Sequence, residues 1–367
     1  LSVKGLMLAL LVSAGISCTP EEGGSGPAAD DFDRQAMLAF WADDYIVPAY
    51  SAYHQSLLAM QGAAQAYTAN PSAATHAALY AKFRQAYLHW QEVSLFEIGK
   101  AEALKLRNNT NIYPADTSGI NGNIKDGTYN LNLPSTYDEQ GFPAIDYLLS
   151  GLGNVNTTNG HFINNPSYGN YLLALINRLE NLTDEVLTDW QTGYRNTFVE
   201  NSGSSATASA NKLINDYVFH FEKELRAGKI GIPAGVFSGN TLPTAVEAFH
   251  SDTLSKSLFM ASAAMHQKFF EGFSYDRDNT GPSLKAYLNY LNVENGSTTL
   301  SDAILQQMNK AQMEGNQLNK SFRTQVENNN TAMLATYDEL QKAVVLLKVD
   351  MMQALNVRVD YIDADGD

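Results

Sequence analysis

The chain has 367 residues, 44% of them hydrophobic, so it is long enough to bury one large core or two medium ones. Its 24 basic and 39 acidic residues give a formal charge of −15. Nucleic-acid binding requires a concentrated basic face, and so does direct docking on an anionic membrane surface. The charge balance therefore argues against both.

The first 32 residues are typical of an exported lipoprotein. Lys4 precedes a short apolar run at 6–12, and small residues lead to Cys18, the chain's single cysteine. This pattern predicts a signal peptide over 1–17 whose apolar core is too short to span a bilayer. Residues 15–18 resemble a lipobox, so we expect lipidation at Cys18 and a flexible tether over 18–32. The alternative is an ordinary secretory peptide with a stray cysteine.

That N-terminus predicts a bacterial envelope protein, anchored to the membrane on the periplasmic face or the cell surface. The lipid anchor is then its membrane contact. A single cysteine also rules out an internal disulfide and a cysteine-based zinc or iron–sulfur site.

Apolar residues recur at helical spacing through the rest of the chain. The first predicted helix covers 33–68, with Pro48 as a kink or break, and the second follows the cap residue Ser72 and runs to about 99. Residues 101–140 lose this periodicity and predict a long irregular loop. Further helices are expected at 143–150, 167–192, 207–227, 244–272, 282–291, 299–327 and 331–355.

The fold class that this pattern predicts is all-α, because no run of alternating or β-branched residues indicates a sheet. The Gly- and Ser-rich stretch 201–210 is the best internal boundary. We therefore expect two helical bundles, over 33–200 and 201–367. A short helix that starts at a Gly/Pro pair occurs in each half, near 141 and 281, as a duplicated bundle would require.

Side chains that could carry chemistry are scattered. The sequence contains no His-Glu-x-x-His, no Gly-x-Ser-x-Gly and no phosphate-binding loop. His89 and Glu92 share one helical face and Glu97 follows, so this stretch could supply metal ligands. A half-buried polar pair on a bundle helix is the simpler interpretation.

Two further polar patterns have simple structural explanations. A later helix carries three polar residues at i, i+4 and i+8, for which we expect a salt-bridged surface: Asp216, His220 and Glu224. Residues 363–367 alternate aspartates like the start of a calcium loop, but the glutamate at position twelve is missing. We interpret them as a solvated tail or a terminal turn.

Three stretches together resemble the imelysin family, which is classified as peptidase family M75 and related to iron-regulated envelope proteins. They are residues 90–99 (WQEVSLFEIG), residues 141–149 (GFPAIDYLL) and the ending at 347–367. The resemblance covers most of the chain after the tether. It implies two related helical bundles with a pocket near their junction.

The signature of that family is Gly-x-His-x-x-Glu, whose His and Glu have been interpreted as metal ligands or catalytic groups. Here Gly141 matches, but Pro143 stands at the His position and Asp146 at the Glu position. The proline side chain has no atom that can bind a metal, and Asp keeps the negative charge of Glu on a shorter side chain. A metal bound here would need ligands from elsewhere. The candidate ligand-binding residues are therefore Gly141, Pro143, Asp146, His89, Glu92 and Glu97.

Together these features predict a non-catalytic, lipid-anchored binding protein, linked to uptake of iron, haem or another small ligand. No catalytic residue and no firm cofactor are assigned, and iron, zinc and calcium are the candidate metals. One alternative is an interaction module that docks on an outer-membrane protein, for which the aromatic residues of 101–140 are the support. The other is an M75-type peptidase, against which Pro143 argues.

Overall fold

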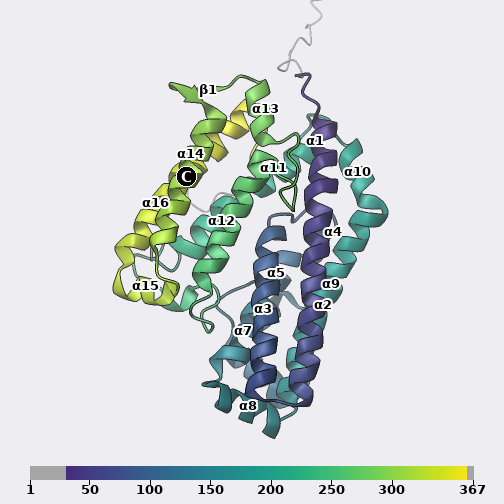
Figure 1. Ribbon diagram of the computed structural model, residues 1–367, viewed down its shortest axis with the longest axis vertical. Helices are drawn as coiled ribbons and strands as arrows, with labels where there is room; N and C mark the ends of the chain where they lie inside the picture. The colour runs from purple at the N-terminus through teal and green to yellow at the C-terminus, as the bar shows by residue number, and fades with distance from the viewer. Residues whose placement is uncertain (1–29, 362–367) are drawn as a thin grey trace, which may run out of the picture. The chain divides into compact units, whose positions relative to one another are not determined.

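The computed structural model describes residues 30–361, and most of them lie in helices (Figure 1). The α-helices are α1 (Arg34–Phe40), α2 (Val47–Ala69), α3 (Ala73–Val93), α4 (Lys100–Leu104), α5 (Leu106–Thr110), α6 (Thr117–Asp126), α7 (Gly141–Asp146), α8 (Val155–Asn164), α9 (Ser167–Asp189), α10 (Arg195–Glu200), α11 (Ser209–Phe219), α12 (Ser255–Glu271), α13 (Leu284–Tyr290), α14 (Leu300–Gln317), α15 (Phe322–Asn328), α16 (Asn330–Val345) and α17 (Met352–Ala354). The all-α fold class is confirmed.

Seven helical segments of other types join or separate these helices. The π-helical ones are η1 (Trp41–Ile46), η3 (Tyr147–Gly151), η4 (Trp190–Tyr194), η5 (His220–Gly231) and η7 (Leu346–Met351). The 3₁₀ ones are η2 (Pro134–Glu139) and η6 (Pro243–Ala245). The strands β1 (Glu294–Asn295) and β2 (Thr298–Thr299) pair antiparallel in a small hairpin.

The long helices form two groups. In the first group, α2 packs against both α3 and α9, and in the second, α14 packs against α16 and α12 (Figure 1). Helix α3 begins as expected at Ser72, whose side chain accepts from the backbone N–H of Thr75 in a capping box. The same helix also packs against α12, so α3 joins the two groups.

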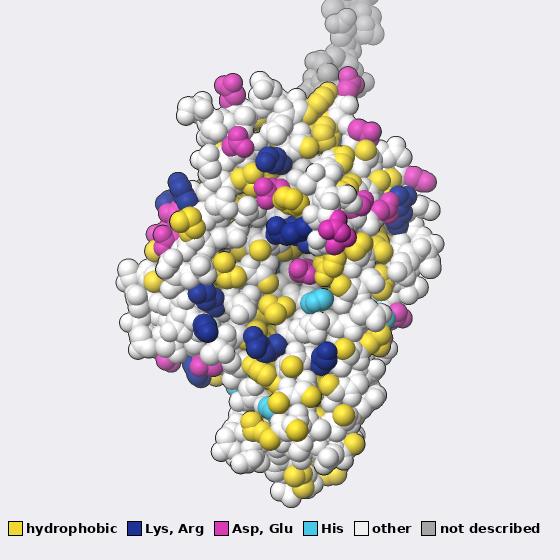
Figure 2. Space-filling model, in the orientation of Figure 1, with side chains coloured by type: hydrophobic (Ala, Val, Ile, Leu, Met, Phe, Trp, Pro, Cys, Tyr) yellow, Lys and Arg dark blue, Asp and Glu magenta, His cyan; other side chains and the backbone are white. Residues whose placement is uncertain are grey.

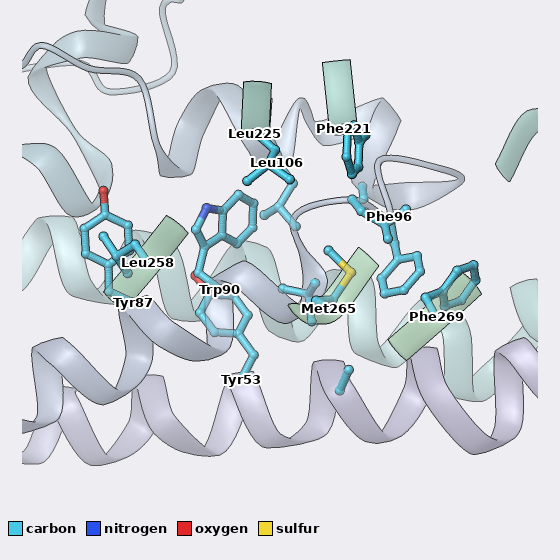
Figure 3. Packing of buried hydrophobic residues seen from close by; sticks show 14 of the residues in the cluster. Tyr53, Tyr87, Trp90, Phe96, Leu106, Phe221, Leu225, Leu258, Met265 and Phe269 are labelled. Carbon is cyan, nitrogen blue, oxygen red and sulfur yellow. The ribbon is translucent and has the colours of Figure 1, made fainter. Parts of the chain in front are cut away.

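Aromatic and aliphatic side chains fill the space where the groups meet. Figure 3 shows Trp90 of α3 close to Tyr53 of α2, with Leu225 of η5 and Met265 of α12 nearby. Trp90 is 1% exposed, and truncating such a residue to alanine typically costs about 3–5 kcal/mol. The described residues from Phe32 onward form one compact unit. The division into bundles near residue 200 therefore stays a prediction.

The segment 101–140 differs from the irregular loop that the sequence predicts. It contains α4, α5, α6 and η2. Helix α6 is capped by Asp116, which accepts from the Ser118 backbone N–H, and it buries only Ile120 and Ile124. Helices this short carry too few apolar residues to show a helical period. In the sequence only their Asn and Gly residues stand out, so the segment is predicted to be a loop.

The expected helix over 244–272 is also shorter than predicted, because α12 begins only at Ser255. Residues 246–254 form turns in which Ala248 and Asp252 are left-handed, each with φ of 54°. Long-range contacts of Glu247 and His250, described below, hold this segment out of the helix. The expected helix 299–327 is likewise split at 318–321, between α14 and α15.

Pro48 does not end the first helix. The π-helical η1 precedes it and the chain continues directly into α2. None of the described helices is long and apolar enough to cross a membrane. The predictions for the signal peptide, for Cys18 and for residues 363–367 fall outside residues 30–361.

Candidate functional site

The stretch that carries the altered family signature is a buried helix, α7. Gly141 begins it with φ of +71°, and a Cβ at this position would lie 2.1 Å from the carbonyl oxygen of Thr110. Only glycine fits this conformation and this contact. Pro143 lies in the first turn, where its missing N–H leaves no helical hydrogen bond unmade. The local sequence thus suits the start of a tightly packed helix.

A cavity of about 200 Å³, here called the motif pocket, lies against α7. Three segments line it: the stretch before α6, α7 itself and the turns that precede α12. Its lining residues are Tyr113, Pro114, Ala115, Thr117, Pro143, Asp146, Thr244, Val246, Ala248, Phe249 and His250. Residues more than a hundred positions apart therefore build one pocket, and two of the three family-signature positions line it.

Asp146 is 1% exposed, and both of its carboxylate oxygens accept hydrogen bonds from the opposite wall. Oδ2 accepts from the backbone N–H of His250 at 2.8 Å, and Oδ1 accepts from the hydroxyl of Ser251. Burial raises the pKa of Asp146 to about 7, although these hydrogen bonds oppose the rise. The carboxyl group therefore fastens α7 to the turn at 250–251.

His250 brings an imidazole into the motif pocket although the signature position holds Pro143. Its ring lies 5.2 Å from that of Tyr147. Burial, and secondarily the charge of Arg323, lowers the pKa of His250 to about 4, so the ring is neutral at neutral pH. The sequence does not single out His250, because its distance along the chain from Asp146 gives no spacing signal.

His89 and Glu92 lie elsewhere, in a groove of about 500 Å³ between α3 and α12 that Arg84 and Tyr275 also line. Both residues are half-buried. The Nδ1 atom of His89 is buried without a hydrogen-bond partner in the described chain. Burial raises the pKa of Tyr275, and Glu92 raises it further. In Figure 2 basic side chains gather along the middle of this face, with acidic and histidine side chains among them.

Glu97 lines a third cavity, of about 440 Å³, together with Arg107 and Asp216. Arg107 donates from Nη2 to Oδ1 of Asp216 at 2.9 Å, and its backbone N–H donates to Glu97 at 3.0 Å. Burial raises the pKa of Glu97 to about 7, which Arg107 opposes. The expected salt-bridged surface is therefore wrong for Asp216, whose side chain is 12% exposed and paired across helices.

The expected surface is also wrong for His220, which belongs to a buried chain of hydrogen bonds. His266 Nδ1 donates to the carbonyl of Ser262 at 2.9 Å, because a carbonyl oxygen can only accept. His266 Nε2 then accepts from His220 Nδ1 at 3.2 Å, and His220 Nε2 accepts from the Ser94 hydroxyl at 2.8 Å. Burial lowers the pKa of both histidines.

Ser94, His220 and His266 resemble the order of groups in a nucleophilic relay, but they are 4%, 2% and 0% exposed. No substrate reaches a serine that is buried in this way. The relay therefore connects α3, η5 and α12, which is a structural role.

Glu247 anchors the motif-pocket wall from behind, and sequence reasoning missed it. It is 2% exposed, pairs with Lys229, and accepts from Asn111 Nδ2 at 2.8 Å and from Gln91 Nε2 at 3.2 Å. Its neighbours Val246 and Ala248 line the pocket. Three donors offset much of the desolvation free energy of this buried carboxylate, and their hydrogen bonds fix the backbone around it.

The six candidate residues thus occupy three separate places rather than one. Within residues 30–361, no group of three or more His, Cys, Asp or Glu side chains is arranged to hold a metal ion. The motif pocket alone combines the family-signature residues with a cavity, and it holds one carboxyl and one imidazole.

Comparison with known proteins agrees with this architecture. The model of the imelysin family, also described as peptidase M75, matches residues 46–349. An iron-regulated protein A precursor from Parabacteroides distasonis has a similar structure, with a TM-score of 0.70 at 17% identity over 89% of this chain and 97% of that one. An imelysin-like protein from Psychrobacter arcticum gives a TM-score of 0.71 at 17% identity, over 90% and 97%.

Among curated proteins none matches this sequence. The two solved structures are too distant in sequence to show more than a shared fold. The family match, in contrast, extends over most of the chain, from the last residue of η1 into η7. This chain belongs to the imelysin family.

Proposed function

We propose that this chain is a non-catalytic binding protein of the bacterial envelope, anchored through Cys18, that takes a small ligand in the motif pocket. The predicted signal peptide and lipobox support the location. The link to iron or haem uptake is part of the proposal, and it draws on the name of the P. distasonis relative, an iron-regulated protein.

One observation carries the proposal. Both carboxylate oxygens of Asp146 already accept hydrogen bonds from His250 and Ser251, and Pro143 offers no polar side-chain atom. Metal binding requires the charged form, so a carboxyl group whose pKa is raised by burial, and whose two oxygens each already accept one hydrogen bond, is a weaker metal ligand than a free carboxylate. The carboxyl group of Asp146 thus fastens the pocket wall.

The size of the motif pocket limits the ligand. At about 200 Å³ it is smaller than the roughly 300–1,000 Å³ of sites for drug-sized molecules. Haem is at least of that size, so a role in haem uptake would require the wall at 246–250 to open. A compact ligand with a polar group for the neutral His250 ring fits better, and the apolar side chains Val246 and Phe249 suit its other side.

Equilibrium titration with iron, zinc and calcium, together with metal analysis of the purified protein, tests this function. We expect no stoichiometric metal bound at the motif pocket, and native mass spectrometry should show a small organic ligand or none. The Asp146→Ala variant is compared with Asp138→Ala, a half-buried carboxyl outside the pocket. Tight metal binding lost only in Asp146→Ala would overturn the proposal.

A peptidase is the second candidate, because an imidazole, of His250, and a carboxyl group, of Asp146, line the same pocket. A neutral imidazole can accept a proton, but a pKa of about 4 makes His250 a weak general base at neutral pH. Cleavage of an unfolded protein such as reduced casein would be measured for the wild type, His250→Ala and Asp146→Ala. Cleavage that both variants abolish would replace binding by catalysis as the function of this pocket.

A further inference from the structure

A second groove, of about 650 Å³, lies along α9 and is here called the amide groove; it shares no lining residue with the motif pocket. It runs between α9, the α4–α5 region and the segment 129–137. Its polar lining consists of five asparagines, two tyrosines and three charged residues: Asn109, Asn130, Asn132, Asn177, Asn181, Tyr129, Tyr137, Lys105, Arg178 and Glu185. Neutral amides and aromatic rings dominate it, in a protein whose net charge is −15.

Arg178 is held in this groove by neutral acceptors. Nε donates to Gln140 Oε1 at 2.6 Å, Nη1 to Asn132 Oδ1 at 2.7 Å and Nη2 to Asn109 Oδ1 at 2.8 Å. A guanidinium has five N–H donors, so these three bonds leave two. The positive charge is fixed in position and no described carboxylate pairs with it.

The one carboxylate of the groove does not neutralise Arg178. Glu185 is exposed, and its carboxylate lies 3.8 Å from the ammonium group of Lys100, a residue that does not line the groove. Lys105 adds a further positive charge at the edge. A rigid guanidinium with spare donors is the arrangement that proteins use to bind carboxylates in two-pronged fashion.

The exposed amides of α9 suit hydroxyl groups. Asn177 and Asn181 lie one helical turn apart on the groove wall, and both are exposed. Asn177 uses its oxygen for a bond from Gln61, which leaves its NH₂ group, and Asn181 makes no side-chain hydrogen bond within residues 30–361. An amide both donates and accepts, as a sugar hydroxyl does.

The aromatic part of the groove is held in place as well. Tyr129 is 36% exposed, and its ring packs edge-on against that of Tyr171 with centroids 4.8 Å apart. Such a ring offers a large apolar surface at little cost in side-chain entropy. Sugar rings combine an apolar C–H face with a rim of hydroxyls, so they match a groove that joins tyrosine rings to asparagine amides.

We propose that the amide groove binds an acidic oligosaccharide, with a sugar carboxylate on Arg178, hydroxyls on Asn177 and Asn181, and a sugar ring against Tyr129. The volume of about 650 Å³ lies within the range of sites that hold ligands of a few rings. This site is independent of the motif pocket, so its failure would leave the proposed function untouched.

Isothermal titration calorimetry with the full chain tests this proposal. The probes are tetragalacturonate, a hyaluronan tetrasaccharide and a mannuronate tetramer, and the methyl ester of tetragalacturonate serves as the uncharged match. We expect saturable binding of at least one acid, and roughly ten-fold weaker binding of the ester, because esterification removes the charge-assisted pair with Arg178. Equal binding of acid and ester, or no binding of any acid at millimolar concentration, would overturn it.

Variants of exposed asparagines locate the site without disturbing the Arg178 network. Asn181→Ala should weaken binding roughly five-fold, as the loss of one hydrogen bond predicts, and Asn177→Ala/Asn181→Ala should weaken it further. The matched control is Asn170→Ala, exposed on the same face of α9 about 16 Å along the axis and outside the groove. Equal losses in Asn170→Ala and Asn181→Ala would refute the assignment.

Discussion

Replacing Asp146 by asparagine should change how the stability of the protein depends on pH. The folded chain holds the Asp146 proton up to about pH 7, because burial raises its pKa, whereas the unfolded chain releases it near the ordinary value of 3.8. Between these values the folded state binds more protons, so the free energy of unfolding falls as pH rises. Asparagine does not titrate, and its carbonyl oxygen can still accept one of the two hydrogen bonds.

The magnitude follows from the shift. A rise of about three units, at about 1.4 kcal/mol per unit, makes ionised Asp146 cost on the order of 4 kcal/mol at high pH. Most of that change, about 3 kcal/mol, falls between pH 4.5 and 7.5. Over this interval the stability of Asp146→Asn relative to wild type should therefore rise by about 3 kcal/mol.

Urea unfolding followed by circular dichroism at pH 4.5, 5.5, 6.5 and 7.5 measures this difference. Subtracting the unfolding free energy of the wild type from that of the variant at each pH removes the contribution of every other titrating group, including the buried Glu97. The control is Asp126→Asn, an exposed carboxyl at the end of α6, which should give a curve parallel to wild type. Parallel curves for Asp146→Asn would show that the carboxyl is not buried and hydrogen-bonded as described.

Three further substitutions test buried contacts at the motif pocket and elsewhere in the core. Gly141→Ala should lower the stability by more than about 2 kcal/mol in thermal melts because its Cβ has no room, whereas Gly122→Ala, in open space on α6, should not lower it. His266→Phe should cost about 2–3 kcal/mol at pH 7, and it should make the loss of stability between pH 6.5 and 4 shallower, because the folded pKa of this histidine, about 4, lies below its unfolded value. Arg107→Ala leaves the buried charge of Asp216 unpaired and should cost about 3–5 kcal/mol in urea unfolding, and a cost under 1 kcal/mol would contradict the buried pair.

The fold was predictable where one helix buries one continuous apolar stripe. The period of α3 and the cap at Ser72 are local, so the sequence displays both. The turns at 246–254 were not predictable. Their apolar residues follow a helical period, but two partners far along the chain, Asp146 and Asn111, hold these residues in a non-helical conformation. Long-range hydrogen bonds to buried carboxylates override local propensity and leave no local trace.

The site was predictable only through the family signature. Gly141 and Asp146 could be identified as candidates from the signature at 141–146. The structure explains both residue types, because Gly141 has no room for a Cβ and Asp146 accepts hydrogen bonds from the opposite wall. His250 and Glu247 could not, because both lie in the turns at 246–254, more than a hundred residues along the chain from their partners Asp146 and Asn111. The helical spacing of His89 and Glu92 correctly placed them on one face, but spacing within a helix does not show which neighbour that face meets.

The wall of the motif pocket is fixed from two sides, and this favours a preorganised binding site. Ala248 and Asp252 both adopt left-handed backbone conformations, each of which costs about 1–2 kcal/mol for a residue other than glycine. Such strain persists only where surrounding contacts determine the backbone. Glu247 supplies them on one side and Asp146 on the other. A ligand that enters therefore meets a wall already held in place, and its binding free energy is not spent on ordering the turn.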